Sequence, residues 1–413
     1  MRVPGDKSIS HRALIVGALA RGRSSLTGLN TGRDVAATAA ALRLLGVEVS
    51  VRSGSAELVG RGLRSLNEPG DVLDCGNSAT TLRMLLGVCA GTPGHFVLTG
   101  DESLRRRPMA RVVDPLRSMG ASIGGRSGGD RAPLAVAGRR LRGGDLTTTV
   151  PSAQVKSALL LAGLMAEGST SVREAVVTRD HTERMLAAAG VPMRREGGCI
   201  VVQGGSEPAP VDRRIPGDVS AAMVLVVATA LGARGPIEIE DVGLNPTRTG
   251  AVEILQRMGA SITVEPAGEW EGEPVGRLRA EPSALRGVSI SPREVPGVID
   301  ELPILAVAAA AAEGETVVEG AAELRFKESD RIAATVEALA SLGANVVEHE
   351  EGFVVRGPWS PGGGVVDARG DHRIAMALMV AAKVAPEPVR VLGAGAADVS
   401  FPGFLQLLEG RER

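Results

Sequence analysis

The sequence predicts an α/β protein of two domains, each built from three copies of one repeated unit. Six long apolar runs, each typical of a buried helix, begin about 70 residues apart, and such a spacing indicates an internal repeat. The chain has 413 residues, whereas a single hydrophobic core stops growing at roughly 250 to 300 residues. Three units per domain satisfy both observations. The runs begin at Ala13, Leu82, Ala158, Ala221, Leu302 and Ile374.

Each repeat is expected to continue from its apolar helix into a strand and then into a second helix. Strand-like segments follow at residues 24–28, 95–100 and 315–320. The amphipathic segments after them close on a glycine and then alternate, which predicts a left-handed helix cap followed by a strand. The sixth repeat instead ends in a predicted helix over residues 401–409. The closing glycines are Gly46, Gly120, Gly190, Gly259 and Gly343.

Composition and charge exclude several classes of protein. The 46 cationic and 48 acidic side chains give a net charge of −2, whereas a general nucleic-acid or membrane-surface binder needs a strong basic excess. Aromatic residues make up 2% of the chain, too few for base-stacking surfaces. The sequence contains neither the GxGxxG dinucleotide signature nor a GxxxxGKS or GxxxxGKT phosphate loop, which argues against nucleotide-dependent chemistry.

The cysteines, the histidines and the apolar runs set further limits. Three widely spaced cysteines without a CxxC pair argue against disulfides and structural zinc, and they favour a reducing compartment. The five histidines lie at no ligand-like spacing, so no metal site is expected. No signal peptide is recognisable, and no apolar run reaches the roughly 20 residues that span a bilayer. We therefore expect a cytoplasmic protein.

A polar cluster precedes each of the six apolar helices. Plain N-capping explains Ser, Thr, Asn and Asp at such positions, and for Asp218 and Ser220 capping and a functional role stay open as alternatives. Capping does not explain cations in or near a first turn, because they oppose the helix dipole unless an anion joins them. These cations are Lys7, Arg12, Arg83, Lys156 and Arg373.

Lysine usage supports the idea of anion-binding helix starts. Only four of the 46 cations are lysine, and Lys7, Lys156 and Lys327 all lie in polar segments where a compact ammonium suits chemistry. Lys383 follows the last apolar helix and is interpreted as a surface charge. We expect Lys327 at the start of the fifth amphipathic helix. We also expect a helical first turn that begins at a proline and directs Arg107 toward the same face as the other helix starts.

If the helix starts of the two domains face one another across a cleft, they present several cations to a small, multiply anionic substrate. Acid–base capacity comes from Asp300, Glu328, Asp371 and His372 in the same segments. No nucleophile motif such as GxSxG is present in the sequence. The residues alone thus predict a non-covalent, metal-independent group transfer or the plain binding of anionic ligands.

Six motifs support a more specific prediction. They are GDKSISHR at 5–12, GNSATTLR at 76–83, RRPM at 106–109, PSAQVKSA at 151–158, FKESDR at 326–331 and DHR at 371–373. In this order, and over the whole chain, they resemble the 5-enolpyruvylshikimate-3-phosphate (EPSP) synthase family. The resemblance implies a two-domain inside-out α/β barrel, or prism, with six βαβαββ repeats, three per domain, and an active site in the interdomain cleft.

The resemblance also implies a reaction. The enolpyruvyl group of phosphoenolpyruvate (PEP) passes to the 5-hydroxyl of shikimate 3-phosphate, with release of phosphate, in the shikimate pathway of aromatic amino-acid biosynthesis. No cofactor is implied. The partners are the two small-molecule substrates, without nucleic acid or membrane, and we expect a monomer.

Residues at matching positions receive roles from the same resemblance. The catalytic candidates are Lys7, Asp300 and Glu328 together with His372, where Asp300 accepts the hydroxyl proton and Glu328 protonates the methylene carbon. The candidates for binding shikimate 3-phosphate are Lys7, Ser8, Arg12, Ser152, Ala153, Gln154, Arg179, Asp300 and Lys327. The candidates for binding PEP are Lys7, Asn77, Ala79, Thr80, Arg107, Gln154, Arg331 and Arg373.

Two positions and the start of the sequence depart from the family pattern. Ala153 replaces a serine that many members carry, which removes one phosphate donor. Ala79 occupies the position of a glycine that leaves room for glyphosate in the herbicide-sensitive branch, so we expect glyphosate tolerance. A short strand usually precedes the first motif, whereas only four residues precede Gly5 here, so we expect this strand to be missing.

The domain boundary is placed at residues 207–216, a proline- and charge-rich passage near the midpoint. The N-terminal domain is then residues 6–216, on the shikimate 3-phosphate side. The C-terminal domain is residues 217–413 together with residues 1–5, where the resemblance places the first strand.

Two other functions stay open at this point. The sister enzyme that transfers enolpyruvate to UDP-N-acetylglucosamine shares the implied fold and chemistry, but its opening motif and its reactive loop cysteine are not found in this sequence. A non-catalytic anion-binding relative is the other possibility, although a mere binder has no need of Asp300, Lys327 and Glu328 together.

Overall fold

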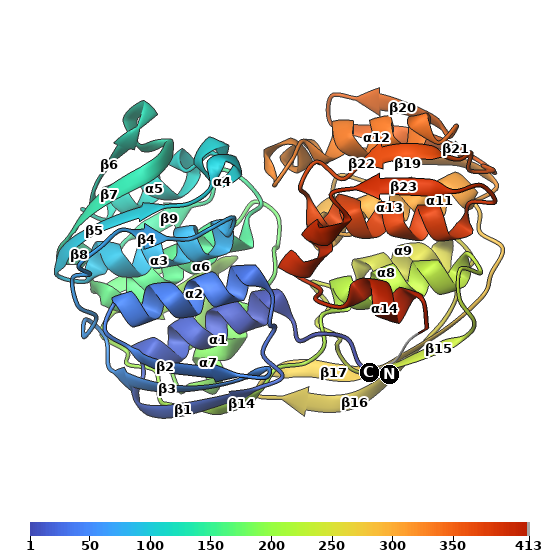
Figure 1. The fold of residues 1–413 in the computed structure, drawn as a ribbon. Coiled ribbons are helices and arrows are strands. Elements are labelled where there is room, and N and C mark those ends of the chain that lie inside the picture. The colour runs from blue at the N-terminus through green and yellow to red at the C-terminus, as the bar shows by residue number, and fades with distance from the viewer. Residues whose placement is uncertain (411–413) are drawn as a thin grey trace. The chain divides into compact units, whose positions relative to one another are not determined.

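The computed structural model describes residues 1–410, which divide into two compact units (Figure 1). The N-terminal unit consists of Gly5–Ile215 and the short segment Glu269–Glu273. The C-terminal unit consists of Met1–Pro4, Pro216–Gly268 and the described residues from Pro274 onward. Each unit has its own hydrophobic core. Within residues 1–410, none of the helices has the length and apolar character needed to cross a membrane.

Six helices are buried along almost their whole length, which confirms the helices predicted from the apolar runs. Aliphatic side chains cover nearly all sides of each helix, so each one forms the centre of a core rather than a surface layer. The N-terminal unit contains α1 (Lys7–Leu19), α3 (Ala79–Gly91) and α6 (Ala153–Met165). The C-terminal unit contains α8 (Val219–Ala230), α11 (Leu302–Ala311) and α13 (His372–Val384).

Two glycines allow α3 and α6 to lie close together in the N-terminal unit (Figure 1). A Cβ atom at Gly87 would lie 2.2 Å from the carbonyl oxygen of Ala158, and one at Gly91 would lie 2.3 Å from the Cβ atom of Met165. Glycine costs about 1 kcal/mol in a helix interior relative to alanine. The close packing of the two helices explains why these positions are glycine.

Three four-stranded sheets surround the core of the N-terminal unit, each with one parallel pair and one antiparallel hairpin. Their strand orders are β14-β1-β3-β2, β4-β5-β7-β6 and β12-β13-β11-β9. The strands are β1 (Arg21–Thr27), β2 (Glu48–Arg52), β3 (Ser55–Arg61), β4 (Leu73–Asp74), β5 (Gly94–Thr99), β6 (Ser122–Arg126), β7 (Arg131–Gly138), β9 (Asp145–Thr147), β11 (Ser169–Arg173), β12 (Met193–Glu196), β13 (Cys199–Gln203) and β14 (Asp212–Arg214). A small sheet pairs β8 (Leu141–Arg142) with β10 (Ala166–Glu167). The other helices are α2 (Arg33–Leu44), α4 (Glu102–Arg106), α5 (Ala110–Ser118) and α7 (His181–Ala188).

The C-terminal unit has sheets of order β15-β17-β16, β18-β19-β21-β20 and β22-β23. The strands are β15 (Ile237–Gly243), β16 (Ser261–Trp270), β17 (Glu273–Glu281), β18 (Ser289–Ile290), β19 (Gly314–Val318), β20 (Asn345–His349), β21 (Gly352–Gly357), β22 (Gly364–Asp367) and β23 (Val389–Leu392). The other helices are α9 (Gly250–Arg257), α10 (Val295–Val298), α12 (Arg331–Ser341) and α14 (Phe404–Leu408). The last repeat ends in α14 rather than in a hairpin, as predicted, but this helix is shorter than the expected 401–409.

The predicted left-handed glycine caps are confirmed. Each of the five amphipathic helices α2, α5, α7, α9 and α12 ends before a glycine of positive φ, and a strand follows. The φ angles are +85° at Gly46, +97° at Gly120, +80° at Gly190, +95° at Gly259 and +86° at Gly343.

Each unit completes its first sheet with residues from a distant part of the chain. In the N-terminal unit, β14 lies parallel to β1, although β14 is the last strand before the chain leaves this unit at Pro216. In the C-terminal unit, the Met1 ammonium donates to the carbonyl oxygen of Glu238 at 2.8 Å, and the Met1 carbonyl accepts from the Glu240 N–H at 2.9 Å. Met1 therefore pairs with β15, while the Pro4 carbonyl accepts from the Asp218 N–H at the start of α8.

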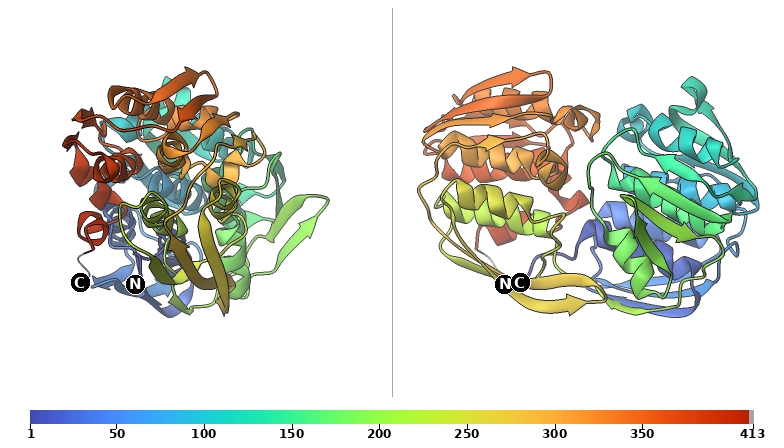
Figure 2. Two further views of the ribbon diagram at one scale, coloured as in Figure 1. Left: turned by 90° about the vertical axis from the view of Figure 1, so that its right-hand side faces the viewer. Right: turned by 180° about the vertical axis from the view of Figure 1, so that it is seen from behind.

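The strands β16 and β17 form a long hairpin, drawn in yellow in Figure 2. The turn of this hairpin, Glu269–Glu273, belongs to the N-terminal unit. The amphipathic pattern of the sequence contains no sign of this placement, because the turn contacts residues that are far away along the chain.

Candidate active site

Three helix starts in the N-terminal unit carry most of the predicted binding residues. Asp6, Ser78 and Ser152 cap α1, α3 and α6, and each side chain accepts a hydrogen bond from a backbone N–H of the first turn. Capping occupies one donor per helix, so further first-turn N–H groups and the helix dipole are available to an anion. The predicted residues in these first turns are Lys7, Ser8, Ala79, Thr80, Ala153 and Gln154.

Arg12 is buried with neutral hydrogen-bond acceptors around its guanidinium. Its Nε donates to Thr182 Oγ1 at 2.8 Å, its Nη2 to Ser157 Oγ at 2.8 Å, and its Nη1 to the Ser8 carbonyl at 2.9 Å. Burial, joined by the positive charge of Arg179, lowers the pKa of Arg12 to about 10 in spite of carboxylates at longer range. A phosphate bound beside Arg12 would stabilise its charged form.

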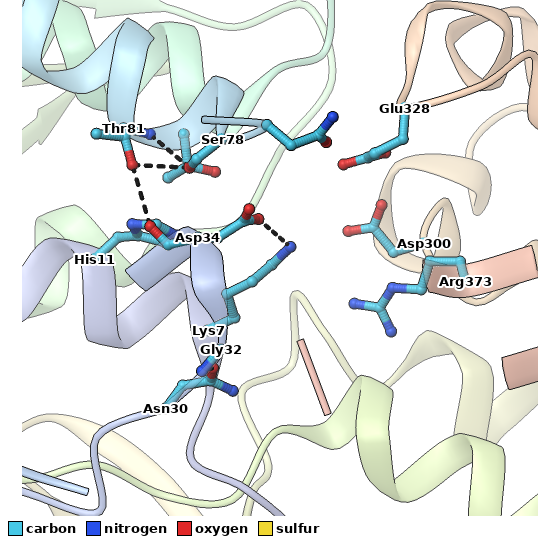
Figure 3. Close-up of polar contacts among 12 residues, drawn as sticks. Lys7, His11, Asn30, Gly32, Asp34, Ser78, Thr81, Asp300, Glu328 and Arg373 are labelled. Carbon is cyan, nitrogen blue, oxygen red and sulfur yellow. Dashed lines mark hydrogen bonds and ion pairs between the residues drawn. The ribbon is translucent and has the colours of Figure 1, made fainter. Parts of the chain in front are cut away.

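Lys7 is held by a carboxylate from the neighbouring helix. Its Nζ lies 2.9 Å from Asp34 Oδ2, as Figure 3 shows, and the Asp34 side chain is only 6% exposed. Asp34 lies in the first turn of α2, where a carboxylate is favoured by the helix dipole. Sequence analysis did not select Asp34, because such a residue is also common at ordinary helix starts.

The predicted residues Asn77 and Arg107 lie together. Arg107 Nη2 donates to Asn77 Oδ1 at 2.7 Å, and Asn77 Nδ2 donates to Asp101 Oδ2 at 2.7 Å. The expectation of Arg107 beside a proline-initiated first turn is wrong, because Arg107 is the C-cap of α4 and α5 begins only at Ala110.

Gln154 connects α6 with α3. Its Nε2 donates to Thr80 Oγ1 at 3.0 Å, and its Oε1 accepts from Arg83 Nη1 at 2.6 Å. Arg83 also donates to the Pro108 carbonyl at 3.0 Å. Arg83 therefore orients Gln154, a role that sequence analysis missed although this arginine ends the GNSATTLR motif.

A buried polar chain connects these helix starts, and Figure 3 shows its end at Thr81 and Ser78. His11 Nδ1 lies 2.7 Å from Thr38 Oγ1, which lies 2.7 Å from Thr81 Oγ1, and Thr81 donates to Ser78 Oγ at 2.8 Å. Burial, followed by the charges of two neighbouring cations, holds the pKa of His11 well below its usual 6.5. A neutral imidazole thus connects α1 through α2 with the start of α3.

Lys156 does not face a ligand, and the expectation that a bound anion compensates it is wrong. Its Nζ lies 2.9 Å from Glu174 Oε2 and 2.7 Å from Glu183 Oε1, and its side chain has no exposed surface. The chain itself supplies the compensating anions.

Asp218 and Ser220 take part in capping and in a side-chain network at the start of α8. Asp218 Oδ1 accepts from the Ser220 N–H at 2.9 Å, and Arg248 Nη2 donates to Ser220 Oγ at 2.7 Å. Ser220 Oγ in turn donates to the buried carboxylate of Glu301. This network anchors the residue that directly follows Asp300.

Of the three cysteines, Cys75 and Cys89 are buried, whereas Cys199 is half-buried. Burial raises the pKa of Cys75 and of Cys89 far above the usual value, which disfavours a reactive thiolate. Among residues 1–410, no group of three or more His, Cys, Asp or Glu side chains could hold a metal ion.

The C-terminal unit gathers three carboxylates around Arg331, which is 1% exposed. Arg331 Nη1 lies 3.1 Å from Asp300 Oδ1, Nη2 lies 2.6 Å from Glu328 Oε2, and Nε lies 2.8 Å from Asp371 Oδ2. Burial acts to lower the pKa of Arg331, but the carboxylates of Asp371, Glu328 and Asp300 together raise it above its usual value. The predicted acid–base residues therefore lie around one common cation.

Lys327 also belongs to this cluster, since its Nζ lies 3.4 Å from Asp300 Oδ1. Its expected place at the start of the fifth amphipathic helix is wrong. Lys327 follows the 3₁₀ helix Ala322–Phe326, and α12 begins at Arg331 with Asp330 as its N-cap.

The start of α13 carries two further predicted residues, His372 and Arg373. Asp371 caps this helix by accepting the Arg373 N–H at 2.8 Å, and His372 is buried directly after the cap. The Nε atom of Arg373 is buried and has no hydrogen-bond partner among residues 1–410. Because an unpaired buried donor is costly, this guanidinium favours an anionic ligand.

The chain matches one known family over nearly its whole length. The family model of EPSP synthase (3-phosphoshikimate 1-carboxyvinyltransferase) matches residues 1–408. A 3-phosphoshikimate 1-carboxyvinyltransferase from Synechococcus sp. (strain JA-3-3Ab) is 50% identical over 411 residues, which cover 98% of this chain and 93% of that protein. Another, from Desulforudis audaxviator (strain MP104C), is 50% identical over 407 residues, with coverage of 98% and 95%.

Solved structures agree with this match. An EPSP synthase from Acinetobacter baumannii superposes with a TM-score of 0.86 at 41% identity, covering 100% of this chain and 94% of that chain. The enolpyruvyl transferase NikO from Streptomyces tendae gives a TM-score of 0.80 at 18% identity over 99% of this chain and 94% of that chain, a likeness of fold alone. The predicted mixed α/β fold is confirmed.

Proposed function

The chain belongs to the EPSP synthase family, and we infer from this that it acts as a 3-phosphoshikimate 1-carboxyvinyltransferase in aromatic amino-acid biosynthesis. The enzyme transfers the enolpyruvyl group of PEP to shikimate 3-phosphate and releases phosphate. The family match over residues 1–408 carries this conclusion, because it includes both units and all six motifs. Transfer to UDP-N-acetylglucosamine is disfavoured by the same match.

We propose that each unit contains three βαβαββ repeats. The two units together would form a two-domain inside-out α/β barrel, or prism. The proposed domains are residues 6–216, and residues 1–5 with 217–413. Three buried helices in each unit, with sheets that combine a parallel pair and a hairpin, support this proposal. We also propose a cleft between the domains and a monomeric state, which scattering with and without substrates would test. A cytoplasmic location is a further proposal, which cell fractionation would test.

Binding of shikimate 3-phosphate is proposed for the surroundings of Arg12. The guanidinium of Arg12 is buried among neutral oxygen atoms, and Arg179 adds a second cation that influences it. A phosphate dianion compensates both charges and accepts several hydrogen bonds. The proposed ligands are Lys7, Ser8, Arg12, Ser152, Ala153 through its backbone, Gln154 and Arg179, together with Asp300 and Lys327.

Binding of PEP is proposed for a second group of residues. Arg373 supports this through its buried Nε without a partner, and Arg107 is fixed beside Asn77. Arg331 uses four of its five N–H donors on carboxylates, which leaves one hydrogen on Nη1 for a ligand. The proposed ligands are Lys7, Asn77, Ala79, Thr80, Arg107, Gln154, Arg331 and Arg373.

The proposed mechanism uses the carboxylates around Arg331. Asp300 accepts the proton of the 5-hydroxyl while that oxygen bonds to C2 of PEP, and Glu328 gives a proton to C3, so that a tetrahedral intermediate forms. The C2–O bond to phosphate then breaks, and Glu328 takes a proton back from the C3 methyl to restore the double bond. Lys7 and Lys327 stabilise the anionic oxygens, and His372 is the candidate that passes protons to the leaving phosphate.

One assay separates the candidate functions. Phosphate release from PEP is measured with shikimate 3-phosphate, with UDP-N-acetylglucosamine, and with neither. Release only with shikimate 3-phosphate is expected. Release with the sugar nucleotide would overturn the proposal in favour of the sister reaction, and no release with either acceptor would favour an anion-binding protein.

A further inference from the structure

The turn between β16 and β17 is firmly held within the N-terminal unit. The Gly272 carbonyl accepts from Arg184 Nη1 at 2.9 Å. The guanidinium of Arg214 lies over the ring of Trp270, 3.6 Å from its centroid. These contacts fix the turn to residues of the N-terminal unit in α7 and β14.

Glu273, the first residue of β17 after this turn, makes a buried charge-assisted contact. Its Oε1 lies 2.7 Å from His181 Nδ1, and the two side chains are only 3% and 2% exposed. A carboxylate at this depth is costly unless a specific donor satisfies it. The partner, His181, is the first residue of α7.

The first turn of α7 connects this contact with Arg12. Thr182, directly after His181, accepts from Arg12 Nε at 2.8 Å and lies 2.7 Å from Ser157 Oγ. Arg184 ties the same turn to the hairpin, because it donates both to the Gly272 carbonyl and to Asp180 Oδ1 at 2.9 Å. One side of this helical turn is thus fixed by the hairpin, and the other side holds Arg12.

We propose that Glu273 and His181 are positioning residues for Arg12, and that the β16–β17 turn thereby sets the affinity of the phosphate site. This inference rests on the proposed function, because it takes Arg12 as a ligand of shikimate 3-phosphate. Neither residue touches the substrate; each acts through the first turn of α7 and Thr182. The charge of Glu273 also favours the protonated form of Arg12.

Steady-state kinetics of Glu273→Gln test the proposal. The KM for shikimate 3-phosphate is expected to rise about tenfold, because the glutamine amide keeps the shape and an acceptor but loses the charge that strengthens the bond to His181. The kcat and the KM for PEP should stay within about twofold, because the carboxylates around Arg331 are untouched. Glu269→Gln is the matched control, since it changes an exposed carboxylate of the same turn and should leave all three parameters unchanged.

A second pair of variants keeps the proposal testable if Glu273→Gln folds poorly. His181→Asn retains an N–H donor close to the Nδ1 position and should nearly preserve the KM for shikimate 3-phosphate, whereas His181→Leu should raise it as Glu273→Gln does.

In a Trp359→Phe background Trp270 is the only tryptophan, so its emission reports on the turn. Shikimate 3-phosphate should change this emission, and Glu273→Gln should weaken the change.

The outcomes distinguish this inference from the function on which it rests. A wild-type protein without turnover of shikimate 3-phosphate would contradict the function itself. A working wild type whose Glu273→Gln variant loses only thermal stability, with an unchanged KM for shikimate 3-phosphate, would overturn the positioning role. An equal rise in KM for Glu269→Gln would overturn it as well.

Discussion

Arg12 and Arg331 are both buried, yet their surroundings carry opposite charge. Arg12 donates to two hydroxyls and a carbonyl, whereas Arg331 donates to three carboxylates. The pKa of Arg12 is lowered to about 10 by burial, and that of Arg331 is raised by its carboxylate partners despite burial. The comparison teaches that the groups bonded to Arg12 leave its charge uncompensated, whereas the groups bonded to Arg331 supply three carboxylates. This difference agrees with the proposed phosphate site around Arg12 and the proposed proton transfer around Arg331.

The largest expected effect concerns proton transfer in the C-terminal unit. Glu328→Gln keeps the shape and the hydrogen bond to Arg331 but removes the exchangeable acid. We expect kcat to fall by about 10²- to 10⁴-fold, with both KM values little changed. Glu337→Gln, an exposed carboxylate on α12, is the control and should behave as wild type. A Glu328→Gln variant with normal kcat would remove Glu328 from the mechanism.

The two arginines should differ in their contribution to stability. Arg331→Met leaves the buried carboxylate of Asp371 and the half-buried carboxylates of Asp300 and Glu328 without this cation, so the free energy of unfolding should fall by about 3–5 kcal/mol. Arg12→Met leaves only neutral groups and should cost about 1 kcal/mol, while it raises the KM for shikimate 3-phosphate. Denaturant titrations of both variants measure the difference, and equal losses would break the comparison.

Acid should affect the N-terminal unit through His11. Its pKa is depressed in the folded state, so the unfolded chain binds more protons below pH 6.5 and stability falls as the pH falls. Relative to His11→Asn, which can still donate to Thr38, the wild type should lose about 1.4 kcal/mol per pH unit below about pH 6.5. Urea unfolding at pH 7.5, 6.5 and 5.5 measures this, and parallel curves for the two proteins would argue against a neutral buried His11.

The smallest expected effect concerns glyphosate on the N-terminal side. Ala79 is 6% exposed and is the first residue of α3, where its methyl group should crowd an inhibitor longer than PEP. Ala79→Gly is therefore expected to lower the inhibition constant for glyphosate several-fold with little change in the KM for PEP. Inhibition titrations of both proteins provide the test, and equal sensitivity would show that Ala79 does not control access.

The helix starts were predictable because a helix buried on all sides requires a long apolar run, and its cap requires a polar residue before it. Asp6, Ser78 and Ser152 all follow that rule. The errors lie at element ends: Arg107 and Lys327 occupy short connections whose geometry depends on packing rather than on local propensity.

Partners distant in sequence could not be predicted. Lys156 resembles a ligand-binding lysine until Glu174 and Glu183 are seen beside it, because the sequence does not reveal which anion a cation meets. His181 and Glu273 are 92 positions apart, and only the folded chain brings them together. Asp34 could not be singled out because a carboxylate in a first helical turn is common, and Arg83 was expected to meet an anion rather than Gln154.

The pairing of β1 with β14 has a consequence for the order of synthesis. Ser24 Oγ accepts from the Val211 N–H across 187 positions, so the first sheet keeps an open edge until residues 212–214 have left the ribosome. Glu273, which contacts His181 at the start of α7, is translated later still. The N-terminal unit is therefore the first to be translated but cannot finish folding until well over half of the chain has emerged. A gene fragment coding only for residues 5–215 should yield a unit that lacks Glu273, the carboxylate partner of His181.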